Sequence, residues 1–318
     1  MLRVLVGVWM FIVSAIAFAQ YPERPIRLIV PWPPGQATDI AGRLMAQGLQ
    51  LAMGQPVVVD NRAGAGGMIG TDVAAKAVPD GYTLLAGSSG PVTVSPLLQK
   101  VPYEQEKHLA PVHLCCVSPY LLVAHPSFPA SNIREFIAVV KANPGKYTFS
   151  SSGTGATAHL ISEWFNSLAQ LQATHVPYRG SAPSLADVIG GQINYSIETL
   201  ATTGPLVRSG KLKTFGVSLE KGTTLYPEVP AIAKAADMPG FDAGAWLGLM
   251  APMGTSREII ARLSVEMAKI LADPEMSKRF AGAGLEVDSR PSEPFAAYLK
   301  AQTARFAGII KAGNIKVE

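Results

Sequence analysis

The chain has 318 residues, of which 48% are hydrophobic and 16% are charged, a composition that excludes a disordered chain and a collagen-like repeat. The 27 Lys and Arg residues against 23 Asp and Glu give a formal net charge of +4. The charges are scattered, without a block of five or six of one sign, so nucleic acid is not an expected partner.

The amino terminus has the three parts of a secretory signal peptide. Arg3 is followed by an apolar run over 4–19 in which Ser14 is the only polar side chain, and the small residues Ala17 and Ala19 precede Gln20. A retained membrane anchor is the alternative, but the run is shorter than the ~20 residues that a span needs. Residues 1–19 are therefore predicted to be a signal peptide that is cleaved after export.

Short apolar strands alternate with longer helical patterns along the rest of the chain. This alternation is typical of an α/β fold in which helices cover parallel strands. The pattern predicts strands at 26–30, 56–59, 82–86 and 147–150, and helices at 39–51, 65–77, 132–142 and 156–171.

Two apolar strand-like segments, 120–126 and 241–252, bracket a middle region with strands and helices of its own. They are candidates for crossings between two lobes, a division that the length of the chain allows. Helical patterns at 256–272, 274–281 and 294–312 would then return to the first lobe. Asn132-x-x-Glu135 and Thr255-x-x-Glu258 each match a capping box at a helix start.

The only cysteines, Cys115 and Cys116, are neighbours in the chain. Consecutive Cα atoms lie ~3.8 Å apart, which is too close for an ordinary disulfide. Their place in the apolar run 112–124 predicts two thiols packed in a buried strand. No metal-ligand spacing such as Cys-x-x-Cys accompanies them, so a metal site is not expected.

The loop 31–39 joins the first predicted strand to a helix and can hold an anion. Its Gly35 permits a turn that exposes backbone N–H groups, and a helix N-terminus adds free donors and a partial positive charge. The alternative is that Thr38 or Asp39 only caps the helix.

A second loop of the same construction, 150–157, precedes the helix that carries His159. If the two loops face each other across a cleft, one acid group is held from both sides, and closure of the cleft is the mechanism of binding. Since no nucleophile or carboxylate is placed beside His159 by sequence, a structural hydrogen bond is a better interpretation of it than catalysis.

The glycine-rich run 62–70 resembles a dinucleotide-binding fingerprint, but Ile69 stands where the third glycine belongs and no acidic residue follows at about twenty positions. Tight packing of the loop against the following helix explains these glycines better.

Several long motifs in chain order carry a resemblance to a known family. They are 21–35 (YPERPIRLIVPWPPG) followed by Thr38-Asp39, 60–67 (DNRAGAGG), 79–85 (PDGYTLL), Gly153-x-Gly155 with His159-Leu160, 176–180 (VPYRG), Asp187, 190–192 (GGQ) and 227–230 (PEVP). With these motifs the chain resembles, over nearly its whole mature length, the tripartite tricarboxylate transporter receptors, also called Bordetella uptake gene receptors.

The resemblance implies a two-lobed α/β fold similar to type II periplasmic binding proteins, with a ligand cleft between the lobes. Residues 20–120 and 246–318 would form lobe 1, and 121–245 lobe 2. It also implies a periplasmic receptor, not an enzyme, that captures a small carboxylate by cleft closure and delivers it to a membrane permease of two other subunits. Neither a cofactor nor a metal is expected, and receptors of this size usually act as monomers.

By the same resemblance, backbone amides and hydroxyls of the two loops hold the ligand, with further residues near the cleft. The expected ligand-binding residues are Gly35, Gln36, Ala37, Thr38, Asp39, Ser88, Ser89, Ser152, Gly153, Thr154, Gly155, Ala156, Thr157, His159, Tyr178, Arg179, Gly180 and Asp187. Gln36 departs from the family, which usually has a second glycine there, so the loop is either stiffer or gains a polar contact.

Two other functions stay open at this point. An exported hydrolase would use Ser152 or Ser88 as nucleophile and His159 as base, but the sequence supplies no evident third group to orient the base. A sensor component that presents its bound ligand to a membrane signalling protein would use the same pocket as a transport receptor.

Overall fold

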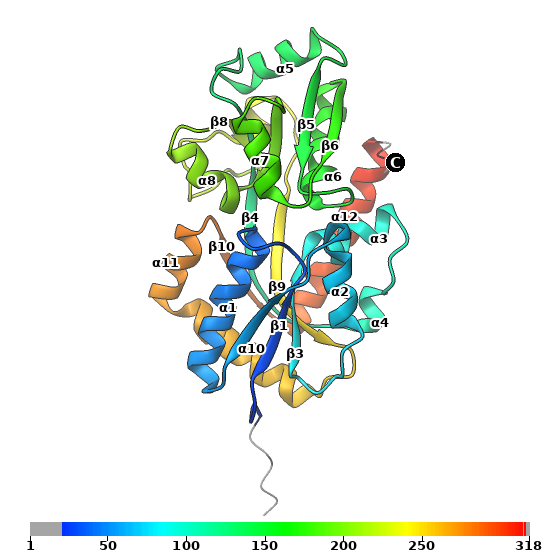
Figure 1. Cartoon of the computed structure of the whole chain (residues 1–318), viewed down its shortest axis with the longest axis vertical. Helices are drawn as coiled ribbons and strands as arrows, with labels where there is room; N and C mark the ends of the chain where they lie inside the picture. Colours follow the sequence, from blue (N-terminus) through cyan, green and yellow to red (C-terminus); the bar gives the residue numbers. More distant parts are fainter. Residues whose placement is uncertain (1–20, 314, 316–318) are drawn as a thin grey trace, which may run out of the picture.

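The computed structural model describes residues 21–313 and 315, so the predicted signal peptide lies outside the described residues. Figure 1 shows two parts, one above the other, joined by long strands. We call the part built around β1, β2 and β3 lobe 1, and the part built around β5, β6 and β7 lobe 2.

Lobe 1 confirms the strand and helix alternation predicted for the first 90 residues. Its elements are β1 (Ile26–Val30), α1 (Ala37–Met53), β2 (Val57–Asn61), η1 (Ala65–Gly67), α2 (Met68–Ala75), β3 (Thr83–Ser88), η2 (Gly90–Val94), α3 (Ser95–Leu98) and α4 (Gln105–His108), with β9 (Gly244–Pro252), α10 (Arg257–Ala272), α11 (Pro274–Gly282) and β10 (Glu286–Pro291) from the second half of the chain.

Lobe 2 repeats the same kind of architecture. Its elements are α5 (Ile133–Lys141), β5 (Tyr147–Ser151), α6 (Thr157–Ala169), β6 (Ala173–Pro177), α7 (Ser181–Ile189), β7 (Tyr195–Thr199), α8 (Leu200–Arg208), β8 (Lys213–Val217) and α9 (Ile232–Ala235). The two remaining elements, β4 (Leu109–Ala124) and α12 (Ser292–Gly313), touch both lobes.

The strands follow the order β2-β1-β3-β9-β4-β7-β5-β6, and β8 and β10 also pair with β4. The pairs β2-β1-β3 and β7-β5-β6 are parallel, as expected. Antiparallel pairs join these two parallel groups, because β9 pairs antiparallel with β3 and β4 pairs antiparallel with β7, β8, β9 and β10. The strands β9 and β4 therefore connect the parallel strands of lobe 1 to those of lobe 2.

One continuous strand connects the two lobes. Residues 109–119 of β4 pair with β9, and residues 120–124 pair with β7, so β4 passes from one sheet into the other (Figure 1). Helix α12 also reaches both cores, because Phe295 packs in lobe 1 and Phe306 in lobe 2. The sequence pattern suggested that the whole helix returns to the first lobe. Its second half packs in lobe 2 instead.

The cap predictions have different outcomes. Asn132 caps α5 by accepting a hydrogen bond from the Glu135 amide at 3.0 Å, as predicted. The prediction that Thr255 caps α10 is wrong. Ser256 caps this helix, and the Thr255 hydroxyl donates to the Pro252 carbonyl instead. A serine beside a threonine offers two candidate caps, and the turn geometry decides between them.

The prediction of two packed thiols is confirmed. Cys115 and Cys116 are free thiols buried in β4. In the described part of the chain, no helix is long and apolar enough to cross a membrane, and no cluster of three His, Cys, Asp or Glu side chains could hold a metal ion.

Candidate ligand-binding site

The first loop turns at Gly35, whose φ of +84° favours glycine, and Asp39 holds the turn in place. The Asp39 carboxylate accepts hydrogen bonds from the Gly35 amide at 2.9 Å and from the Asn61 amide group at 2.8 Å, and Arg43 pairs with it. Burial raises the pKa of this carboxyl, but these hydrogen bonds outweigh burial and lower the pKa below its ordinary value. Asp39 thus shapes the loop rather than capping α1.

The start of α1 is therefore left without a side-chain cap. Its N-cap residue is Gln36, whose side chain makes no cap hydrogen bond. The helix after the second loop, α6, also lacks a side-chain cap, because its N-cap residue Ala156 has only a methyl group, which cannot accept a hydrogen bond. Both helices keep unsatisfied N–H groups and the partial positive charge of their first turn.

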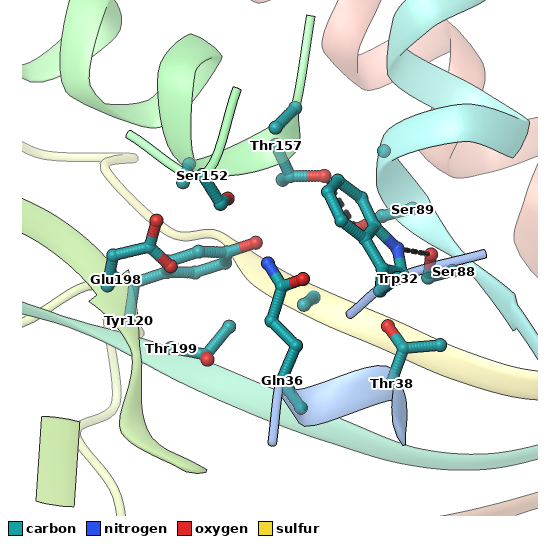
Figure 2. A pocket seen from close by; sticks show the side chains of 15 residues that line it. Trp32, Gln36, Thr38, Ser88, Ser89, Tyr120, Ser152, Thr157, Glu198 and Thr199 are labelled. Carbon is teal, nitrogen blue, oxygen red and sulfur yellow. Dashed lines mark hydrogen bonds between the residues drawn. The ribbon is translucent and has the colours of Figure 1, made fainter. Parts of the chain in front are cut away.

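Figure 2 shows how the two loops and the end of β3 come together around one small cavity. Across it, the hydroxyls of Ser89 and Thr157 lie 2.8 Å apart, while the Trp32 indole N–H donates to Ser88 at 2.9 Å. The cavity is lined by Trp32, Gln36, Ala37, Thr38, Ser88, Ser89, Gly90, Tyr120, Ser152, Ala156, Thr157, Ala158, Glu198, Thr199 and Ala245.

Three helix N-termini meet at this cavity. Ala37 and Thr38 open α1, Thr157 and Ala158 open α6, and Thr199 is the N-cap residue of α8. Each N-terminus favours a negative group by about 0.3–1 kcal/mol when exposed, and by up to about 2 kcal/mol when partly buried. Backbone amides and hydroxyls from both lobes therefore make this cavity suited to an anion.

The cavity also contains a carboxyl group of the protein itself. Glu198, at 1% exposure, receives a 2.8 Å hydrogen bond from the Ser181 hydroxyl. Burial raises the pKa of Glu198 to about 7, although Ser181 and the nearby groups of Ser152 and Thr199 favour the charged form. Of these groups, only the Ser181 hydroxyl meets both the distance and the angle of an ordinary hydrogen bond to the Glu198 carboxyl.

Comparison with known proteins identifies the architecture. Residues 41–315 match the tripartite tricarboxylate transporter family receptor, TctC. The chain belongs to this family. The receptor is 35% identical to BugT of Bordetella pertussis over 325 aligned residues, which cover 100% of this chain and 99% of BugT.

Solved structures agree with this assignment. An R. palustris protein with adipate has a TM-score of 0.90 to the receptor at 30% identity, covering 93% of this chain and 99% of that one. MatC of Rhodopseudomonas palustris, solved with malate, has a TM-score of 0.85 at 30% identity, covering 91% of this chain and 100% of that one. The protein is thus a solute-binding receptor with the fold of periplasmic binding proteins and belongs to a family that is not enzymatic.

The structure brings most of the expected site residues to two cavities of the receptor. Those that line the small cavity are Gln36, Ala37, Thr38, Ser88, Ser89, Ser152, Ala156 and Thr157. Those that line a larger neighbouring cavity of about 620 Å³ are Ser152, Gly153, Thr154, Tyr178, Arg179 and Gly180. The glycine-rich run 63–67 lines the larger cavity too, opposite the second loop.

The other expected residues line neither cavity, and these are Gly35, Asp39, Gly155, His159 and Asp187. His159 is buried, accepts a 3.4 Å hydrogen bond from the Gly155 amide and stacks on His175 with ring centroids 4.0 Å apart. Burial lowers the pKa of His159 to about 4. Asp187 accepts a hydrogen bond from the Tyr178 hydroxyl.

Sequence reasoning missed the lining residues Trp32, Gly90, Tyr120, Ala158, Glu198, Thr199 and Ala245. Trp32 could have been predicted from the sequence, because it lies inside the first loop motif. Glu198 could not have been predicted, because the direction of its side chain depends on how β7 pairs with β4.

Proposed function

We propose that the receptor is exported to the periplasm after loss of residues 1–19, captures a small carboxylate between lobe 1 (20–120 and 246–318) and lobe 2 (121–245), and delivers it to a two-subunit membrane permease. The observation that carries this proposal is the meeting of three helix N-termini without side-chain caps at one cavity, with contributions from both lobes. Adipate and malate in the two related structures are carboxylates, which supports the same class of ligand.

The size of the cavity supports a closure mechanism. The space between its lining side chains is about 30 Å³, and a water needs roughly 10–15 Å³ measured in this way. A dicarboxylate is larger, so the ligand enters only when the lining groups of the two lobes separate. Contacts such as Ser89 to Thr157 would then form again around it.

The hydrolase alternative has no support in the site. Ser88 accepts a hydrogen bond from Trp32, and His159 stacks on His175 and faces the Gly155 amide. Among the described residues, no hydrogen bond joins His159 to Ser88 or Ser152. A nucleophile and its base need such a contact.

A thermal-shift screen of the mature protein tests the proposal. The protein is unfolded and refolded to remove carried-over ligand, then mixed with mono-, di- and tricarboxylates, aromatic acids and amino acids. A ligand at 100 times its Kd adds about 2.7 kcal/mol of stability, which corresponds to roughly 5–10 °C in Tm. A shift with one class of acid, without its turnover, supports the proposal, and unchanged melting with every acid contradicts it.

A further inference from the structure

Two oxygen atoms of the small cavity are buried without a partner. Oε1 of Gln36 and Oε1 of Glu198 make no hydrogen bond of ordinary geometry to the described residues, although the Ser152 hydroxyl and amide and the Thr199 amide lie near the Glu198 carboxyl. The two side chains are 8% and 1% exposed, respectively, and both line the cavity. Buried acceptors in this state are unusual, since nearly all buried polar atoms of native proteins are paired.

A chain of hydrogen bonds holds both oxygens in place. Nε2 of Gln36 donates to the Ser181 hydroxyl at 3.1 Å, and that hydroxyl donates to Oε2 of Glu198 at 2.8 Å. Ser181 has a single hydroxyl hydrogen, which it gives to Glu198, so the Gln36 atom beside it has to be the donor nitrogen. The carbonyl oxygen of Gln36 and the second oxygen of Glu198 are then left for another group.

The two acceptors come from opposite lobes. Gln36 precedes α1, whereas Glu198 lies at the end of β7, and Figure 2 shows both side chains directed into the same space near Tyr120. The described residues that line this cavity include no Lys or Arg. A cationic partner for either oxygen therefore has to come from the ligand.

The chemistry of the two oxygens selects the ligand. A second carboxylate of a ligand offers only acceptors, so it cannot satisfy the carbonyl oxygen of Gln36. It is also repelled by Glu198 whenever that carboxyl, whose pKa is about 7, is ionised. An ammonium or amide group offers two or three N–H donors, which is the chemistry that unpartnered acceptors require. Sites that require such a donor discriminate strongly, because a ligand without it leaves buried acceptors unpaired.

We propose that Glu198 and Gln36 form a subsite for an N–H donor, and that the solute is a small carboxylate that also carries an ammonium or amide nitrogen. This inference rests on the proposed function, because the helix N-termini hold the carboxylate of the same ligand. It restricts the proposed class of ligand from small carboxylates in general to carboxylates that contain nitrogen.

Isothermal titration calorimetry at pH 7.5 with four acids of matched length tests the subsite. The probes are succinate, succinamate, 4-aminobutyrate and butyrate, whose far ends are a carboxylate, an amide, an ammonium and a methyl group. We expect succinamate or 4-aminobutyrate to bind at least tenfold more tightly than succinate and butyrate. The better of these two identifies which nitrogen group the subsite takes.

Two variants and a control assign the preference to the named residues. Glu198→Gln introduces an amide that can donate to a carboxylate, so the preference over succinate should fall at least tenfold. Gln36→Met keeps the length of the side chain without its acceptor and should reduce the preference severalfold. Glu163→Gln is the control, because Glu163 lines neither cavity, and it should keep the wild-type order.

The subsite proposal is wrong if succinate binds as tightly as both nitrogen-bearing acids, or if none of the four acids binds. It is also wrong if Glu198→Gln and Gln36→Met both fold and keep the wild-type preference. In each of these cases the receptor function stands as long as another acid of the broader thermal-shift panel binds. A receptor that no carboxylate stabilises contradicts the proposed function as well.

Discussion

The hydroxyl oxygens of Ser89 and Thr157 lie 2.8 Å apart, although 68 positions separate the two residues. Ser89 stands between β3 and η2 in lobe 1, and Thr157 is the first residue of α6 in lobe 2. Both are buried and line the small cavity, so the bond joins the lobes at the place where the ligand is proposed to bind.

Replacing Thr157 by Val should weaken ligand binding about fivefold to tenfold. Valine keeps the shape of the side chain but loses the bond to Ser89, and a buried hydrogen bond contributes about 1 kcal/mol. Calorimetry with the acid found in the thermal-shift screen measures the effect. Ser162→Ala is the control, because Ser162 bonds within α6 to Ala158. An affinity equal to the wild type would show that this contact does not stabilise the closed state.

Replacing Gly66 by Ala should hinder closure of the lobes. A Cβ at this position would lie 2.9 Å from the Thr154 carbonyl oxygen in the second loop, and φ is +63°. Gly54→Ala is a matched control, since its φ is +72° and nothing lies within 4 Å of the added atom. Small-angle X-ray scattering should show a ligand-induced decrease in the radius of gyration for Gly54→Ala and not for Gly66→Ala. Equal compaction of both variants would contradict the prediction.

Replacing Asp39 by Ala should damage the first loop and not only the start of α1. Loss of the carboxylate leaves the Gly35 amide and the Asn61 side chain without their acceptor. We expect a loss of about 2–3 kcal/mol in unfolding free energy, above the ~1 kcal/mol typical of a cap, and at least tenfold weaker binding. Urea denaturation and calorimetry measure both, with the exposed Glu275→Ala as control. Unchanged binding would mean that the loop keeps its shape without Asp39.

Glu198 should make the unliganded protein less stable as the pH rises. The pKa of this carboxyl is about 7 in the folded chain against an ordinary value of 4.5. The folded state holds the proton to higher pH than the unfolded state, so this stability is complete below pH 4.5 and is lost between pH 4.5 and 7, by up to about 3 kcal/mol. Glu198→Gln removes the titration. Urea denaturation from pH 4.5 to 8 should show the unfolding free energy of the variant rising by this amount relative to that of the wild type. A difference that stays constant with pH would contradict the prediction.

The local elements and both glycine loops could be predicted from the sequence alone. Helix α10 and strand β1 carry their own period and apolar pattern. Gly35 and Gly153 mark the two loops, and the structure has both glycines at positive φ. Such features are determined by residues that are close together in the sequence, so the sequence alone predicts them.

The tertiary structure alone decided what stands between the loops. Glu198 is an unremarkable polar residue near the end of a short strand until the pairing of β7 with β4 sets its direction and burial. Ser181 reaches it from α7, and Gln36 reaches Ser181 across 145 positions of sequence. Local patterns do not encode contacts over such distances, because strand pairing and lobe packing create them. The two glycine loops were therefore predictable, whereas the acceptors proposed to select the ligand required the fold.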